Sequence, residues 1–177
     1  MVIGIDISQI AYGNTGVSNY LLNLVQTLIR KDEVNEYVLF FSSLRSKLKT
    51  ENLKLKNNTN FKIKEYKIPP TLLDLIWNRL HVLPIENFVG DVDVFITSDW
   101  TEPPARRAKK ATILYDLLVY KYPKEMHPKI VSTQKRKIRW VKKESAKIFC
   151  ISEATKKDAA QILNIDSKRL EVIYPGI

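Results

Sequence analysis

Residues 2–29 read VIGIDISQIAYGNTGVSNYLLNLVQTLI, and this stretch decides the fold class. Its first five residues, Val2–Asp6, form a short apolar run that ends at a carboxylate, which is typical of a buried strand. After a loop that reaches Gly16, apolar side chains recur every three or four residues, at Val17, Tyr20, Leu21, Leu24, Val25, Leu28 and Ile29. This spacing predicts a helix with one apolar face.

The same alternation of short apolar runs and helical segments continues along the chain. Further strands are predicted at 37–41, 61–68, 92–97, 111–115, 147–151 and 170–174, and further helices at 72–83, 129–146 and 154–163. Alternation of this kind is the pattern of an α/β fold with a parallel sheet. We expect a Rossmann-like, doubly wound and mostly parallel sheet of about seven strands, with helices on both faces.

Composition limits the class of protein. The chain has 177 residues, a formal net charge of +10 and 45% apolar residues, which excludes an acidic disordered chain and suits one domain over residues 1–177. A single cysteine and two histidines exclude a disulfide framework and give no support for a metal site. No apolar run approaches the roughly 18 residues of a membrane span. Asp6 also interrupts the first apolar run, so we expect no signal peptide and a cytoplasmic protein.

The loop before the first helix is a candidate anion site. It contains Gly13, Asn14, Thr15 and Gly16, and so two of the five glycines in the chain. Glycines let backbone amides approach a ligand closely, and a helix N-terminus favours a negative charge. The alternative is a plain turn between a strand and a helix.

Other candidate residues follow later strands, because α/β sheets bind ligands beyond the carboxyl ends of their strands. These are Ser98, Asp99, Trp100, Tyr115, Asp116, Ser152 and Glu153. A carboxylate such as Asp116 can accept hydrogen bonds from sugar hydroxyls or act as a base, although a lone loop Asp more often caps backbone groups. Ser152 and Glu153 equally suit the cap and first turn of a helix.

The predicted helix at 129–146 is strongly basic. The residues proposed for a basic surface are Lys135, Arg136, Arg139, Lys142 and Lys143. Such a surface could meet anionic lipid, at about 1 kcal/mol per cation, or the phosphates of a nucleic acid. A solvated helix face is the third interpretation.

Six segments, taken in chain order, then suggest a family. They are Gly4–Asp6, Gly13–Leu24, Asp93–Ile96 with Pro103-Pro104, Tyr115–Leu117 with Tyr122-Pro123, Ile151–Asp158 and Val172–Ile177. Together they resemble the N-terminal domain of family 4 retaining glycosyltransferases of the GT-B fold.

The resemblance implies the acceptor-side half of an enzyme that moves a sugar from a nucleotide-sugar donor to an acceptor hydroxyl with retention. The acceptor would be a sugar or a lipid-linked sugar, as in polysaccharide or glycolipid synthesis. The loop 13–16 would face the donor diphosphate, and Tyr115 and Asp116 would be catalytic. Ser98, Asp99, Trp100, Ser152 and Glu153 would line the cleft on the acceptor side. The basic helix would lie at the inner face of the plasma membrane. Neither a cofactor nor a metal is implied.

Two departures from the family pattern matter. Tyr115 stands where the family usually has His, and a phenol cannot carry a proton near neutral pH as imidazole does. The paired glutamates of the donor-binding domain are missing from these 177 residues, so we expect this chain alone to be inactive.

Two alternatives remain at this point. One is a basic α/β domain that binds nucleic acid. The cations are not interleaved with aromatic residues that could stack on bases, so no nucleic acid is expected. The other is a non-catalytic subunit whose donor domain belongs to a separate chain.

Overall fold

The computed structural model describes residues 1–13, 15–48, 53–55 and 58–176. Asn14, one of the candidate site residues, lies outside the described residues.

A parallel sheet of seven strands runs through the protein in the order β3-β2-β1-β4-β5-β6-β7. The strands are β1 (Val2–Asp6), β2 (Glu36–Ser42), β3 (Phe61–Tyr66), β4 (Val94–Thr97), β5 (Lys109–Leu114), β6 (Ser145–Cys150) and β7 (Leu170–Val172). The strand order reverses direction between β1 and β4, which is the point where such sheets form a ligand crevice. The predicted doubly wound α/β fold is confirmed.

The helices predicted after Gly16 and at 72–83, 129–146 and 154–163 are present, with two differences in their bounds, whereas the short helices at 86–89 and 118–121 were not predicted. The helices are α1 (Gly16–Lys31), α3 (Pro70–Leu73), α4 (Glu86–Val89), α5 (Leu118–Lys121), α6 (Pro128–Glu144) and α7 (Glu153–Leu163), with the π-helix η2 (Asp74–Leu80) and the 3-10 helices η1 (Ser8–Tyr12), η3 (Pro123–Glu125) and η4 (Ser167–Arg169). The helix predicted at 72–83 is the pair α3 and η2. The helix predicted at 129–146 ends at Glu144, because Ser145 already pairs with Lys110 in the sheet.

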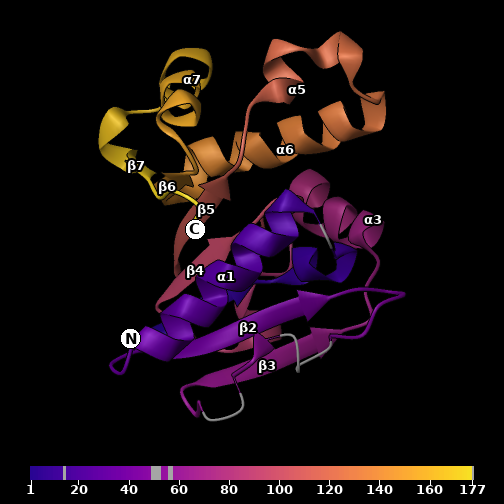
Figure 1. Cartoon of the computed structure of the whole chain (residues 1–177). Helices are drawn as coiled ribbons and strands as arrows, with labels where there is room; N and C mark the ends of the chain where they lie inside the picture. Colours follow the sequence, from indigo (N-terminus) through magenta and orange to yellow (C-terminus); the bar gives the residue numbers. More distant parts are fainter. Residues whose placement is uncertain (14, 49–52, 56–57, 177) are drawn as a thin grey trace.

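The side chains of β2 alternate between the two faces of the sheet and show what covers each face. Tyr37, Leu39 and Phe41 join the core under α1, whereas Val38 and Phe40 join the core under η2 and α4 on the opposite face. On this second face, Ile138 of α6 and Ala159 of α7 pack over β5 to β7. Figure 1 shows α1 crossing the sheet and α6 and α7 grouped at the β5–β7 end. The predicted layers on both faces are therefore present.

Candidate functional site

The N-terminus of α1 opens at the carboxyl edge of the sheet. The Thr15 hydroxyl caps the helix by accepting a 3.1 Å hydrogen bond from the Ser18 amide. Gly13 has a φ of +33°, in the region that favours glycine, and its amide closes η1 on the Ile10 carbonyl. Gly13 and Gly16 both face open space where a Cβ would stand. The loop therefore presents exposed backbone beside the first turn of α1.

Tyr115 and Asp116 follow β5 but differ sharply in their surroundings. The Tyr115 ring is buried edge-on against Tyr20, and its hydroxyl lies 3.2 Å from the Ser98 hydroxyl. Burial raises the pKa of this phenol well above its usual value. Asp116 is exposed, and one carboxylate oxygen accepts a 3.0 Å hydrogen bond from the Leu118 amide. That bond is the local backbone cap considered for this residue, and it leaves the other oxygen, Oδ2, for a ligand.

The loop after β4 is fixed by side chains that reach three successive backbone carbonyls. Lys137 of α6 donates to the carbonyl of Ser98, and Gln134 of α6 donates to that of Asp99 at 3.1 Å. Asn78 of η2 donates to the carbonyl of Trp100 at 2.9 Å. Gln134 also donates to Asp99 Oδ1 at 3.0 Å. The positions of Asp99 and Trp100 are therefore set by two helices on one face of the sheet.

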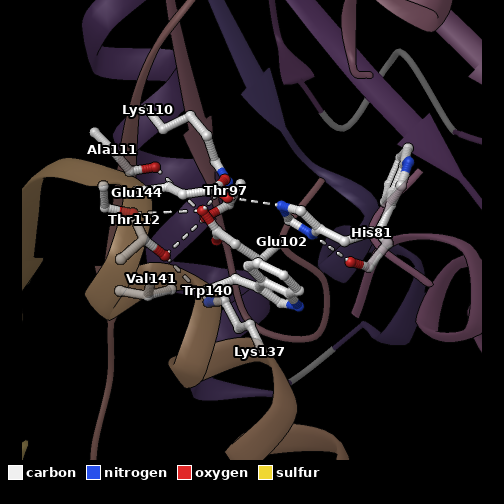
Figure 2. Close-up of polar contacts among 12 residues, drawn as sticks. His81, Thr97, Glu102, Lys110, Ala111, Thr112, Lys137, Trp140, Val141 and Glu144 are labelled. Atoms are coloured by element: carbon white, nitrogen blue, oxygen red, sulfur yellow. Dashed lines mark hydrogen bonds and ion pairs between the residues drawn. The ribbon is translucent and has the colours of Figure 1, made fainter. Parts of the chain in front are cut away.

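Lys137 belongs to a buried polar network that links α6 to the loop after β4 (Figure 2). Its ammonium donates to the Thr112 hydroxyl at 3.1 Å, which lies 2.7 Å from the Thr97 hydroxyl. Thr97 donates in turn to Glu102 at 2.5 Å.

The second half of the network continues from Glu102 toward the surface. Glu102 is paired with Lys110 at 2.9 Å, and Lys110 is paired with Glu144 at the same distance. Glu144 lies 2.9 Å from His81, whose ring stacks on Trp140 with 3.5 Å between the centroids. Figure 2 shows this line of side chains running from Lys137 to His81.

Burial lowers the pKa of Lys137 and raises that of Asp99, although the opposite charges of the two groups counteract both shifts. Lys137 is not among the residues singled out from the sequence, which indicates only that the helix at 129–146 is basic. The signal that could have found it is its spacing, because it lies between Gln134 and Ile138 on the inward stripe of that helix.

Three pockets lie in a row along this edge of the sheet. The first, about 640 Å³, is called the α1 pocket and is lined by Gly16, Val17, Asn19, Tyr20, Asn23, Leu24, Thr27, Tyr115, Asp116, Ile151 and residues 173–176. The central pocket, about 220 Å³, is lined by Val17, Asp99, Trp100, Ile113, Leu114, Tyr115, Asp116, Val119, Met126, Ile130, Gln134 and Lys137. The distal pocket, about 290 Å³, is lined by Tyr12, Pro70, Thr71, Asp74, Trp100, His127, Lys129, Ile130 and Thr133. Each pocket shares wall residues with the next.

The structure brings together some of the predicted site residues and separates others. Asp99, Trp100, Tyr115 and Asp116 line the central pocket, and Gly16 lines the neighbouring α1 pocket. Ser98 is buried beneath them. Ser152 caps α7 by accepting from the Thr155 amide, Glu153 is exposed in the first turn, and neither lines any of these three pockets. Tyr12 belongs to the predicted loop before the first helix, whereas Asp74 and His127 were not expected at the site, since they come from segments outside the predicted loops.

A sequence-family model for Glycosyltransferase Family 4 matches residues 14–177 of the chain. The chain belongs to glycosyltransferase family 4. No curated protein sequence matches it significantly. The match begins after Gly13 and covers α1, the loop after β4 and the end of β5, which border the central pocket.

The basic residues of this family 4 chain do not share one environment. Lys135, Arg139, Lys142 and Lys143 are exposed on α6, and both Arg139 and Lys143 lie over the Trp140 ring, at 4.8 and 5.2 Å from its centroid. Arg136 is half-buried instead, because its guanidinium pairs with Asp74 at 2.7 Å. Two of these exposed cations therefore flank the Trp140 indole, whereas Lys135 lies over the Tyr120 ring, 5.3 Å from its centroid.

Two further observations concern the described part of this glycosyltransferase-family chain. Across residues 1–13, 15–48, 53–55 and 58–176, no group of three or more His, Cys, Asp or Glu side chains is placed to hold a metal ion. Within the same residues, every helix is too short or too polar to cross a membrane.

Proposed function

We propose that this chain forms the acceptor-side half of a retaining glycosyltransferase. The enzyme would move a sugar from a nucleotide-sugar donor to an acceptor hydroxyl, in the synthesis of a polysaccharide or glycolipid. The observation on which the proposal depends is the central pocket, which joins two carboxylates to an indole in a chain of glycosyltransferase family 4.

The chemistry of the central pocket suits a sugar ring. Among the described residues, Asp99 Oδ2 and Asp116 Oδ2 receive no hydrogen bond, so each can accept one from a ligand hydroxyl. Trp100 offers the apolar ring surface on which the C–H face of a sugar can pack. The volume of about 220 Å³ equals that of about seven water molecules. This is the size of a single pyranose with its hydroxyls.

The α1 pocket is the proposed donor side. Gly16 and the first turn of α1 line it, and a helix N-terminus with accessible backbone amides favours a diphosphate. Asp116 lies in the walls of both the α1 pocket and the central pocket, and so borders the place where donor and acceptor would meet. Most donor contacts would come from a second domain, in a longer form of this chain or on a separate chain. We expect no transferase turnover from residues 1–177 alone.

The exposed cations of α6 support a second part of the proposal, which is association with a membrane. Arg139 and Lys143 lie over the Trp140 ring, and an indole flanked by cations suits the interface of an anionic bilayer. Lys135 and Lys142 are exposed on the same helix. We propose that the protein works at the cytoplasmic face of the plasma membrane, bound there peripherally.

The acceptor site can be tested by saccharide binding to the purified chain. Saturation-transfer NMR with methyl glycosides of common neutral pyranoses gives a dissociation constant without requiring a donor. Asp99→Asn keeps an oxygen for Gln134 but replaces the second carboxylate oxygen with a donor, and should weaken binding about tenfold. Asp116→Asn should act in the same direction. Asn23→Ala, on the exposed face of α1 in the neighbouring pocket, is the matched control and should leave binding unchanged. Unaltered binding in both Asp variants would refute the acceptor role of the pocket.

A further inference from the structure

The central pocket lies between the α1 pocket and the distal pocket. Trp100 and Ile130 stand in the walls of both the central and the distal pockets. Val17, Tyr115 and Asp116 stand in the walls of both the central and the α1 pockets. If an acceptor sugar in the central pocket turns its reacting hydroxyl toward Asp116, the opposite end of that sugar faces Trp100 and the distal pocket.

The buried carboxylate of the distal pocket already has its hydrogen-bond partners within the protein. Asp74 accepts four hydrogen bonds, from Asn78, from Arg79 and twice from Arg136, which is about the capacity of a carboxylate. The Thr133 hydroxyl accepts from Arg136 at 3.0 Å. Asp74 therefore has no oxygen left to accept from a ligand hydroxyl, and Thr133 retains only its own O–H group and one lone pair.

The surface that is left for a ligand is mainly apolar. Trp100, Ile130 and Pro70 supply indole, aliphatic and pyrrolidine surface, and Tyr12 adds a ring that is 52% exposed. The remaining polar side chains, Thr71, His127 and Lys129, are solvent-exposed. The central pocket differs in this respect, because Asp99 and Asp116 each keep one carboxylate oxygen that receives no hydrogen bond from the described residues.

We propose that the distal pocket binds an apolar aglycone, so that the acceptor is amphiphilic: a sugar in the central pocket that carries an alkyl or aryl group past Trp100 into the distal pocket. The inference rests on the proposed function, since it assigns the sugar to the acceptor site. It adds a binding site made of residues 12, 70–71, 100 and 130 and a class of acceptor, one with a hydrophobic group on the end that does not react.

The test compares the binding of methyl and octyl glycosides of the same pyranose, below the critical micelle concentration of the octyl glycoside. Phenyl glycosides of the same pyranose serve as a second apolar ligand, one that does not form micelles. The measured quantity is the ratio of dissociation constants within a pair. Burial of only about two methylene groups gives roughly tenfold tighter binding, so octyl and phenyl glycosides should bind at least about tenfold more tightly than methyl glycosides.

Two variants address the distal pocket alone. Tyr12→Ala removes an exposed wall, and Thr71→Trp places a large ring in the pocket from the exposed α3. Both should bring the ratio close to one while methyl glycosides bind as before. Tyr122→Ala is the matched control, because Tyr122 is 50% exposed and lines none of the three pockets, and the ratio should not change.

The outcomes separate this inference from the proposed function. If methyl glycosides bind in an Asp99-dependent way but the ratio is near one in every pair, the inference fails and the acceptor pocket stands. The inference is also overturned if the ratio of dissociation constants stays unchanged in both Tyr12→Ala and Thr71→Trp. It is overturned as well if the distal pocket tightens the binding of a methyl disaccharide as much as that of the octyl glycoside. If no glycoside of any kind binds, both proposals fail.

Discussion

Glu102 and Lys110 form an ion pair of 2.9 Å in which the side chains are 0% and 4% exposed, so both charges lie inside the protein. Lys110→Met leaves Glu102 buried without this cation, and removal of one partner of a buried pair is strongly destabilising. We expect the free energy of unfolding to fall by about 3–5 kcal/mol in a urea titration followed by circular dichroism. Lys109→Met, at the exposed neighbouring position, is the control. Equal losses in the two variants would contradict this prediction.

The stability conferred by Lys137 should depend on pH in a particular direction. Burial lowers its pKa in the folded protein below the ordinary value of 10.5. Between the folded pKa and 10.5 the unfolded chain binds a proton that the native protein does not, so stability rises with pH in that window. Relative to Lys137→Met, the wild-type chain should therefore gain stability as the pH is raised from about 7 to about 10.

The measurement is a series of urea titrations of both proteins across this range. Lys135→Met, on the exposed side of the same helix, controls for the loss of a charge. A wild-type advantage over Lys137→Met that stays constant or shrinks as the pH rises would show that Lys137 is not held in a desolvated site.

Membrane association should depend on the exposed cations Lys135, Arg139, Lys142 and Lys143 of α6. Changing all four together to Glu reverses their charge, and should abolish co-sedimentation with vesicles that contain phosphatidylserine. The control changes four exposed lysines elsewhere to Glu, with the same change in net charge: Lys62, Lys64, Lys67 and Lys157. Wild-type binding should fall with added salt, because exposed charges are screened. Equal loss in both variants would point to net charge rather than to the α6 surface.

The sequence predicted the sheet because most strands contain short apolar runs. Segments with a helical period also separate β1 from β2, β3 from β4, β5 from β6 and β6 from β7. It also predicted that Asp99, Trp100, Tyr115 and Asp116 would meet, since parallel strands end at one edge. It did not separate Arg136 from the other cations of α6, because the Asp74 that pairs with it lies 62 positions away. The distal pocket is built from η1, α3, the loop after β4 and α6, and no periodicity connects residues from such distant segments.

Tyr115→Phe should separate the structural role of this residue from a role at the ligand. The phenol is buried against Ser98 and Tyr20, and the pKa of Tyr115 is raised by that burial, so the hydroxyl holds the loop after β4 and keeps its proton. Loss of the hydrogen bond to Ser98 should cost about 1 kcal/mol of unfolding free energy, measured in urea. Binding of methyl glycosides should stay within about threefold of wild type. Asp116→Asn should weaken it more, because Asp116 lines the central pocket and its Oδ2 receives no hydrogen bond from the described residues. Weaker binding in Tyr115→Phe with unchanged stability would place the hydroxyl in contact with the ligand, and would give this phenol the role that the family usually assigns to His.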